Sequence, residues 1–335
     1  MEKGPTNPVT ETLSGDSALW RAMYRAMLRI RRFEEAIGDC VESGEIIGPA
    51  HLYIGEEAVA TGVCLALRRD DFIFGAHRSH GHYLAKGGDM AALAAEIFGK
   101  ATGCSEGRGG SMHIIARDVG LLGTSALVGG GFGPGVGTAL ASRLQGRDRV
   151  TAIFFGDGAT EEGIFFEALN FAALHHLPVI FVCENNGYSS HLRIQERQPI
   201  DTLYEHAAVY RIPSIRVDGN DVRAVHQTGL EAVDRARKDQ GPTFIEAMTY
   251  RWRGHVGPKL DLDVGLRTRE ELDSWIARCP IENLANFMDE VGAWNPGERQ
   301  AIDREVAQEV ATAIGFARQS PRPDPSELLW HVYQD

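Results

Sequence analysis

Short apolar runs alternate with longer amphipathic segments along the chain. Between residues 19 and 42, apolar side chains recur every three or four positions, which predicts one long amphipathic helix. Residues 151–155 and 178–183 are short β-rich apolar runs, and the segment between them carries apolar side chains at helical spacing. A strand, a crossover helix and a second strand of this length make a right-handed parallel βαβ unit. The pattern therefore predicts an α/β fold.

The rest of the pattern extends this prediction to most of the chain. We expect residues 17–320 to form a single domain, with a mainly parallel sheet flanked by helices on both faces. Residues 1–16 are predicted to be a disordered or partner-binding arm, and residues 321–335 a tail. Residues 251–269 form a long loop without periodicity, a kind of loop that is commonly functional. Further strands are predicted near residue 72 and over residues 213–217 and 243–250. Helices are predicted over residues 56–67 and 89–99. Two more helices are predicted to end at about residue 144 and at about residue 238, and the chain is predicted to be helical from residue 269 onward.

The composition narrows the class of protein. Of 335 residues, 43% are apolar, which is enough for a sizeable core. The net charge of −12 is spread without a basic block, so nucleic-acid binding is disfavoured, and the arginine-rich face of the first helix is interpreted as a solvated or interface surface. No apolar stretch approaches the roughly 20 residues that span a bilayer. Five cysteines without a CxxC motif, and an N-terminus without a basic region followed by an apolar run, predict a cytoplasmic protein.

Candidate chemistry follows the two strands of the βαβ unit. Gly156-Asp157-Gly158 ends the first strand, and Asn186 follows the second. Open α/β sheets bind ligands at the carboxyl ends of their strands, and neighbouring strands lie roughly 5 Å apart. A carboxylate, an amide oxygen and a turn carbonyl at that separation are hard-oxygen ligands for Mg²⁺. The alternative is a ligand-free turn in which Asn185 and Asn186 act as caps.

GDG, then 26 residues, then NN resembles the thiamine-diphosphate motif. From about residue 19 to residue 284 the chain resembles the alpha subunit of the two-chain decarboxylating component of 2-oxo acid and acetoin dehydrogenase complexes. The resemblance implies a thiamine-diphosphate-binding fold. It also implies Mg²⁺ held by Asp157, Asn186 and the carbonyl of Tyr188. Cofactor contacts are implied for the residues around the first motif, which are Gly156, Asp157, Gly158 and Ala159.

The resemblance assigns further roles residue by residue. Arg78, in HRSHGH, matches the arginine that binds the cofactor's diphosphate, a task suited to a planar guanidinium fork. His51, in GPAHLYIG, inherits an acid/base or substrate-orienting role beside the reaction centre, and Tyr53 of the same segment is assigned to the cofactor site. His80 matches a histidine near the phosphate and catalytic channel. His255 matches a loop histidine that contacts the cofactor, closes over the mouth of the site and assists acyl transfer to a lipoyl arm.

The glycine-rich stretch from residue 121 to residue 137 contains no G-x-G-x-x-G, so a Rossmann dinucleotide site is disfavoured. In the resembling family this segment uses backbone groups to hold the aminopyrimidine ring, and the matching positions are Ala126 and Val128. Ala126 replaces the usual glycine. Functional and structural interpretations of Ser111 and His113, in GGSMHI, both stay open.

His77, His80 and His82 have loose metal-ligand spacing. No nearby cysteine or carboxylate completes a ligand set, so a zinc site at these three residues is disfavoured. By resemblance, His77 stands where pyruvate-specific relatives carry tyrosine, and acetoin-type relatives are more similar to this sequence. Val256 stands where relatives controlled by phosphorylation carry serine.

One group expected of the superfamily is missing from this chain. The resemblance implies a glutamate on the pyrimidine nitrogen, carried by a beta subunit, whereas Glu56 and Glu57 are expected to pack or cap a helix. We therefore expect an α2β2 heterotetramer that acts on a 2-oxo acid or acetoin and passes the acyl group to a lipoyl-bearing acyltransferase. Two alternatives remain. The unusual segment GPKLDLDVG keeps open an acyloin-forming enzyme without a lipoyl partner, and the third possibility is a non-catalytic regulatory paralogue.

Overall fold

The computed structural model describes residues 8–263 and 265–330. Six strands form one sheet in the order β2-β1-β3-β4-β8-β7, and every neighbouring pair is parallel. The α/β prediction is confirmed, and the predicted βαβ unit consists of β3, α6 and β4. The strands are β1 (Phe72–Gly75), β2 (Leu121–Thr124), β3 (Thr151–Gly156), β4 (Val179–Asn185), β7 (Ser214–Asp218) and β8 (Thr243–Met248).

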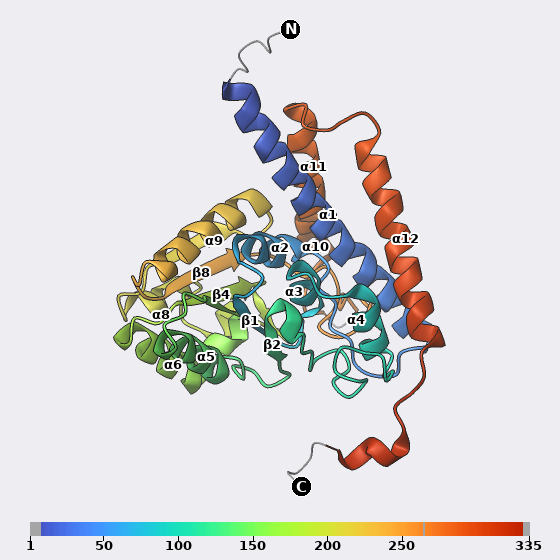
Figure 1. Ribbon diagram of the computed structural model, residues 1–335, viewed down its shortest axis with the longest axis horizontal. Helices are drawn as coiled ribbons and strands as arrows, with labels where there is room; N and C mark the ends of the chain where they lie inside the picture. The colour runs from blue at the N-terminus through green and yellow to red at the C-terminus, as the bar shows by residue number, and fades with distance from the viewer. Residues whose placement is uncertain (1–7, 264, 331–335) are drawn as a thin grey trace.

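Helices cover both faces of the sheet (Figure 1). Along β3, Phe155 packs with α5 and α6 on one face, whereas Phe154 joins the cluster that contains α2 and α9 on the other. Strands buried on both faces read as continuous apolar runs, which explains the sequence pattern. The helices are α1 (Pro8–Glu42), α2 (Glu57–Ala66), α3 (His80–Ala85), α4 (Met90–Ile97), α5 (Phe132–Leu144), α6 (Gly163–Leu174), α7 (Ile194–Arg197), α8 (Tyr204–Ala208), α9 (Val222–Arg237), α10 (Arg269–Ile276), α11 (Pro280–Glu290) and α12 (Glu298–Gln319).

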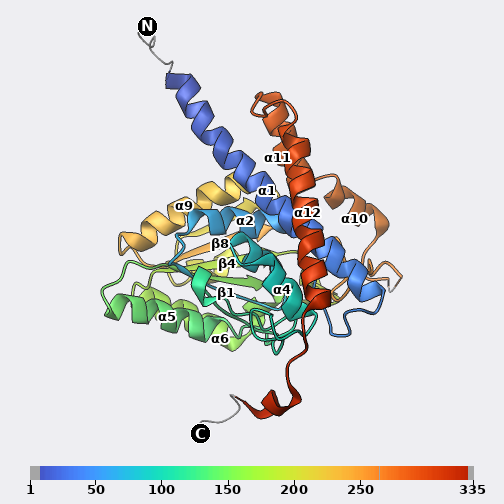
Figure 2. The ribbon, with the colours of Figure 1, turned by 45° about the vertical axis from the view of Figure 1, so that its right-hand side comes forward.

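The first and last long helices lie side by side (Figure 2). Arg21 pairs with Glu298 at 2.8 Å and Arg29 pairs with Glu309 at 2.7 Å, so the arginine-rich face of α1 is an intramolecular interface with α12. The opposite side of α1 buries Phe33 and its apolar neighbours. The helix begins at Pro8, earlier than the sequence pattern predicted, and residues 1–7 and 331–335 of the predicted arm and tail lie outside the described residues.

Several short elements were not predicted from the sequence. β2 lies in the glycine-rich stretch, and the segment after β4 contains a small hairpin and α7. The tail contains a turn of 3-10 helix, Pro325–Leu329. Within residues 8–263 and 265–330, no helix combines the length and the apolar character needed to cross a membrane. The hairpin strands are β5 (Tyr188–Ser189) and β6 (Leu192–Arg193).

The order of the strands reverses in the middle of the sheet. From β1 the chain continues to β2 on one side, whereas β3 leads to β4 on the other side, and β1 and β3 are neighbours. In open α/β sheets this reversal leaves a crevice at the carboxyl ends of the two strands, because their connections lead away in opposite directions. The fold therefore places the residues after Gly75 and after Gly156 at the edges of one crevice.

Candidate functional site

A pocket occupies the crevice at the strand reversal. His77 and Arg78 follow β1, Asp157 follows β3, and Asn186 follows β4, so three strand ends contribute to one wall. The loop before α5, the loop that carries His51 and the loop after β8 complete it. The predicted site residues that line the pocket are His51, Arg78, Ala126, Val128, Gly156, Asp157, Gly158, Ala159, Asn186, Tyr188 and His255.

Asp157 supplies a buried carboxylate at the floor of the pocket. It begins the 3-10 turn Asp157–Glu161 and is 1% exposed. Its carboxylate forms an ion pair with the guanidinium of Arg197, a partner that the sequence did not reveal because Arg197 lies 40 positions away, at the end of the short helix α7. Burial raises the pKa of Asp157, and the Arg197 cation opposes this shift. A side chain at Gly158 would collide with Ser189, so the turn needs glycine.

The amide of Asn186 is oriented by two hydrogen bonds. Its Nδ2 donates to Glu56 at 3.0 Å, and its Oδ1 accepts from the backbone N–H of Tyr188 at 3.2 Å. The phenol of Tyr188 donates to Glu271, away from the pocket, which leaves only the backbone of Tyr188 available to a ligand. Asn186 and Tyr188 therefore line the same pocket as Asp157.

Glu56 lines the pocket, contrary to the prediction that both glutamates pack or cap. Its carboxylate is 1% exposed, makes no capping hydrogen bond to α2, and lies 3.5 Å from Nε of Arg78. Oε2 has no hydrogen-bond partner among the described residues. Burial raises the pKa of Glu56 to about 7, opposed by Arg78 and assisted by the like charge of Glu184. Glu57 does pack, since it pairs with Arg31 at 2.6 Å.

Arg78 is held in the pocket by two backbone carbonyls. Nη1 donates to the carbonyl of Leu52 at 2.8 Å and Nη2 donates to the carbonyl of His255 at 3.2 Å. The side chain is 6% exposed, and its nearest carboxylate is that of Glu56. A guanidinium that is buried, held by backbone carbonyls and only loosely paired with a carboxylate is suited to bind an anion.

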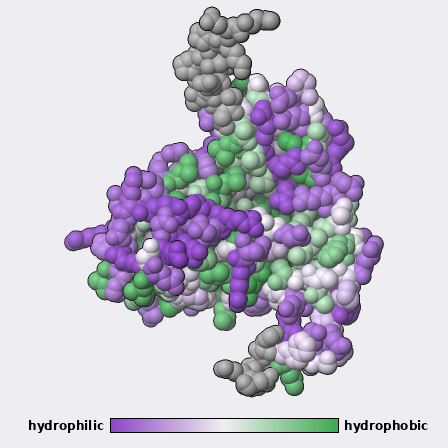
Figure 3. Space-filling model, in the orientation of Figure 1, coloured by the Kyte–Doolittle hydropathy of each residue, from purple (hydrophilic) through white to green (hydrophobic). Residues whose placement is uncertain are grey.

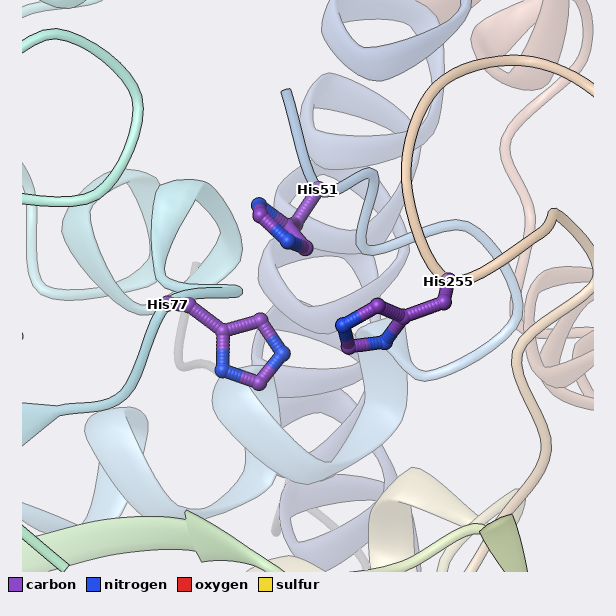
Figure 4. A group of neighbouring side chains, drawn as sticks. All are labelled: His51, His77 and His255. Atoms are coloured by element: carbon purple, nitrogen blue, oxygen red, sulfur yellow. The ribbon is translucent and has the colours of Figure 1, made fainter. Parts of the chain in front are cut away.

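Three histidines meet at the pocket, from three different loops (Figure 4). The ring centroids are 4.6 Å apart for His51 and His77, 5.1 Å for His51 and His255, and 5.3 Å for His77 and His255. Burial and the nearby Arg78 cation lower the pKa of His51 to about 3, of His77 to about 2 and of His255 to about 4. All three imidazoles are therefore neutral near pH 7.

His80, His82 and Tyr53 do not line the pocket. His80 contacts Glu34 through Nδ1 at 3.0 Å and Ser111 through Nε2 at 2.9 Å. His82 contacts Glu184 at 2.8 Å, and the Tyr53 phenol donates to the same carboxylate. These residues form a buried polar layer, in which His82 and Tyr53 contact the pocket residue Glu184, whereas His80 does not. The direct contacts expected of His80 and Tyr53 with a cofactor would need a rearrangement of this layer.

The loop before α5 forms the outer rim. Ala126 and Val128 line the pocket, and the side chains of Leu127 and Val128 are 75% and 54% exposed. Gly129 has a φ of 75°, which turns the chain toward α5 in a conformation that glycine adopts readily. His113 is exposed and does not line the pocket, although its neighbour Met112 does.

Comparison with known proteins agrees with this geometry. The family model described as dehydrogenase E1 component matches residues 25–326. The alpha subunit of acetoin:2,6-dichlorophenolindophenol oxidoreductase from Bacillus subtilis (strain 168) is 42% identical over 322 residues, covering 96% of this chain and 95% of the relative. The pyruvate dehydrogenase E1 component subunit alpha of Porphyra purpurea is 41% identical over 320 residues, covering 93% of this chain and 92% of the relative. The chain therefore belongs to the dehydrogenase E1 component family.

Proposed function

We propose that this chain is the alpha subunit of a thiamine-diphosphate-dependent and Mg²⁺-dependent 2-oxo acid or acetoin dehydrogenase. The enzyme cleaves a carbon–carbon bond next to a carbonyl and passes the acyl group to a lipoyl group. The observation that carries the proposal is the pocket at the strand reversal, which Asp157, Asn186 and Arg78 line together. It occurs in a chain of the dehydrogenase E1 component family.

The polar groups of the pocket fit a magnesium diphosphate. Asp157 and Asn186, with the Tyr188 carbonyl, offer hard oxygens for Mg²⁺, and the Arg197 guanidinium now balances the charge that Mg²⁺ would balance. Arg78 offers N–H donors to phosphate oxygens. Glu56 Oε2 and His51 Nδ1 are buried without a hydrogen-bond partner among the described residues, as expected of groups that complete their hydrogen bonds with a ligand.

Thiamine diphosphate, when bound, supplies the carbanion stabilisation that protein side chains lack. This chain's residues would hold and enclose it. Gly156, Gly158 and Ala159 line the pocket next to Asp157 in sequence and would offer backbone groups to the diphosphate, and Ala126 and Val128 line it from the loop before α5. His51 and His255, as neutral imidazoles, can each donate one hydrogen bond and accept another at the substrate end.

The exposed rim supports a partner subunit. Leu127 and Val128 at the rim, together with Val256 beside His255, expose apolar side chains next to a polar pocket. Exposed apolar groups around a site are typical of an interface. We therefore propose that a beta subunit covers this rim in an α2β2 heterotetramer and supplies the activating glutamate, and that a lipoyl-bearing acyltransferase takes the acyl group.

The test is a substrate screen of this chain co-purified with its beta partner. The screen supplies thiamine diphosphate, Mg²⁺ and an artificial electron acceptor, with pyruvate, acetoin and branched 2-oxo acids as substrates. We expect turnover that requires both chains and both cofactors. Equal turnover by this chain alone would contradict the shared site. Formation of an acyloin in place of acyl transfer would favour the ligating enzyme, and loss of Mg²⁺-dependent cofactor binding would favour a regulatory paralogue.

A further inference from the structure

The histidine cluster at the pocket has the composition of a transition-metal site. His51, His77 and His255 each offer one ring nitrogen, and these three atoms lie within 4.8 Å of one another. Figure 4 shows the rings converging on a common space from three separate loops. His80 and His82, the histidines nearest to His77 in sequence, contact Glu34, Ser111 and Glu184 and take no part in this cluster.

The cluster is also in the chemical state that binds metals. Imidazole must be neutral to coordinate a metal, and the low pKa values of these side chains keep all three neutral near pH 7. His51 is 6% exposed, and its Nδ1 has no hydrogen-bond partner among the described residues. Nε2 of His255 makes only a long contact, 3.5 Å, with Ser190. The ring nitrogens are therefore not committed to strong hydrogen bonds.

We propose that His51, His77 and His255 form a binding site for one borderline divalent transition-metal ion, such as Zn²⁺, with its fourth position open to the pocket. Three imidazoles with one open position are an established ligand set for zinc. Mg²⁺ prefers oxygen ligands, so this site and the site at Asp157 select different metals.

The geometry requires only small movements. A zinc ion with Zn–N bonds of about 2.1 Å at tetrahedral angles holds its nitrogens about 3.4 Å apart. Because the three nitrogens lie within 4.8 Å of one another, each pair needs to approach by no more than about 1.4 Å, which side-chain rotation on loops can supply. The cations Arg78 and Arg251 lie close enough to lower the histidine pKa values, and they also repel a metal ion. We therefore expect exchangeable binding.

The site would interfere with cofactor loading, a consequence that rests on the proposed function. Arg78 donates to the carbonyl of His255, so the proposed diphosphate-binding group and the histidine cluster share one wall of the pocket. A metal ion bound by the histidines adds positive charge and volume at the substrate end of the pocket, where it would repel and displace the cationic thiazolium ring of the cofactor. Binding of the transition metal and of thiamine diphosphate should be mutually exclusive.

The experiment uses the co-purified complex, without an affinity tag, freed of cofactor and metals by chelation. Co²⁺ serves as the spectroscopic probe, because tetrahedral Co²⁺ with nitrogen ligands absorbs visible light far more strongly than Co²⁺ in an octahedral oxygen site. We expect saturable visible absorption, displaced by Zn²⁺ and not by Mg²⁺. His77→Gln should bind Co²⁺ at least ~10-fold more weakly. The matched control is His175→Gln, which alters an exposed histidine outside the pocket and should leave Co²⁺ binding unchanged.

Two results would overturn the site. One is wild-type absorption in both His77→Gln and a second variant, His255→Gln, each checked by thermal unfolding. The other is a spectrum of octahedral oxygen ligation only. The competition arm adds thiamine diphosphate with Mg²⁺ and should bleach the absorption. If calorimetry records cofactor binding while the absorption persists, mutual exclusion is wrong. If calorimetry records no cofactor binding, the proposed function fails and the metal site stands.

Discussion

Single residues decide which groups face the pocket. Glu56 and Glu57 are adjacent in sequence, yet Glu57 pairs with Arg31 inside the body whereas Glu56 faces Arg78 and Asn186. Successive residues at the start of a helix point in different directions, so only one of them can join a given buried pair. The sequence predicts packing or capping for both glutamates, and it does not distinguish the pocket residue Glu56 from the packed residue Glu57.

The raised pKa of Glu56 predicts a pH-dependent stability. Because its folded pKa of about 7 exceeds the unfolded value of 4.5, the folded state holds the proton more tightly. Its stabilising contribution is fully present below about pH 4.5 and is lost as pH rises through about 7. The shift corresponds to an effect on the order of 3 kcal/mol. Glu56→Gln cannot ionise, so its melting temperature relative to wild type should rise between pH 4.5 and pH 8 in calorimetric scans. A constant difference would contradict the shift.

Asp157 is expected to control binding of the proposed Mg²⁺ complex. Asp157→Asn keeps the shape of the side chain and removes the charge that Mg²⁺ needs. Its affinity for thiamine diphosphate with Mg²⁺ should fall at least ~10-fold, about 1.4 kcal/mol, in calorimetric titration of the co-purified complex. Asp118→Asn, in an exposed carboxylate outside the pocket, serves as the control and should bind normally. Equal affinities of the two variants would remove Asp157 from the metal site.

At the scale of elements, the sequence predicted strands and helices correctly where the periodicity of apolar residues was strong. β3, α6 and β4 were located because two apolar runs and a helical pattern lie in series, and the positions of Asp157 and Asn186 at one sheet edge follow from that order. The partnership of His77 with His51 and His255 could not be predicted, since it joins loops far apart in the chain. α3 begins at His80 and turns that side chain into the interior, which the local spacing did not reveal.

Two kinds of contact between elements should differ strongly in their contribution to stability. Phe165 of α6 is fully buried among Phe132, Phe155 and Phe244, so Phe165→Ala leaves a cavity that should cost about 3–5 kcal/mol of unfolding free energy. Arg25→Ala removes only a solvent-exposed pair with Glu305, worth up to about 1 kcal/mol. Thermal or denaturant unfolding of the two variants measures the contrast. Similar losses of stability would mean that the ion pairs between α1 and α12 contribute more unfolding free energy than exposed ion pairs usually do.

At the scale of the whole molecule, polar and apolar surfaces are unevenly distributed. On the face drawn in Figure 3, hydrophilic side chains gather over the region of α9, with apolar groups beside them. The pocket rim also exposes apolar side chains. The open apolar rim supports the proposal that a partner subunit covers the pocket and supplies the activating glutamate, which the sequence of this chain does not single out.

The rim predicts where a partner is bound. Leu127→Asp places a charge on the rim and should reduce recovery of the beta subunit in co-purification and shift the complex to smaller species in size-exclusion chromatography. Leu174→Asp is the matched control, because Leu174 is 70% exposed on α6 and does not line the pocket, whereas Leu127 is 75% exposed and does. Retention of the partner by the Leu127→Asp variant would place the subunit interface elsewhere.

The ion pairs between α1 and α12 have a consequence for how the protein is made. They join residues separated by 277 to 280 positions. The arginine-rich face of α1 therefore stays without its partner helix until translation has nearly finished. Contacts of such high sequence separation are slow to form. Synthesis from the N-terminus therefore delivers a helix that must wait for the last part of the polypeptide, and a nascent chain stalled before α12 would leave that helix open to chaperones and proteases.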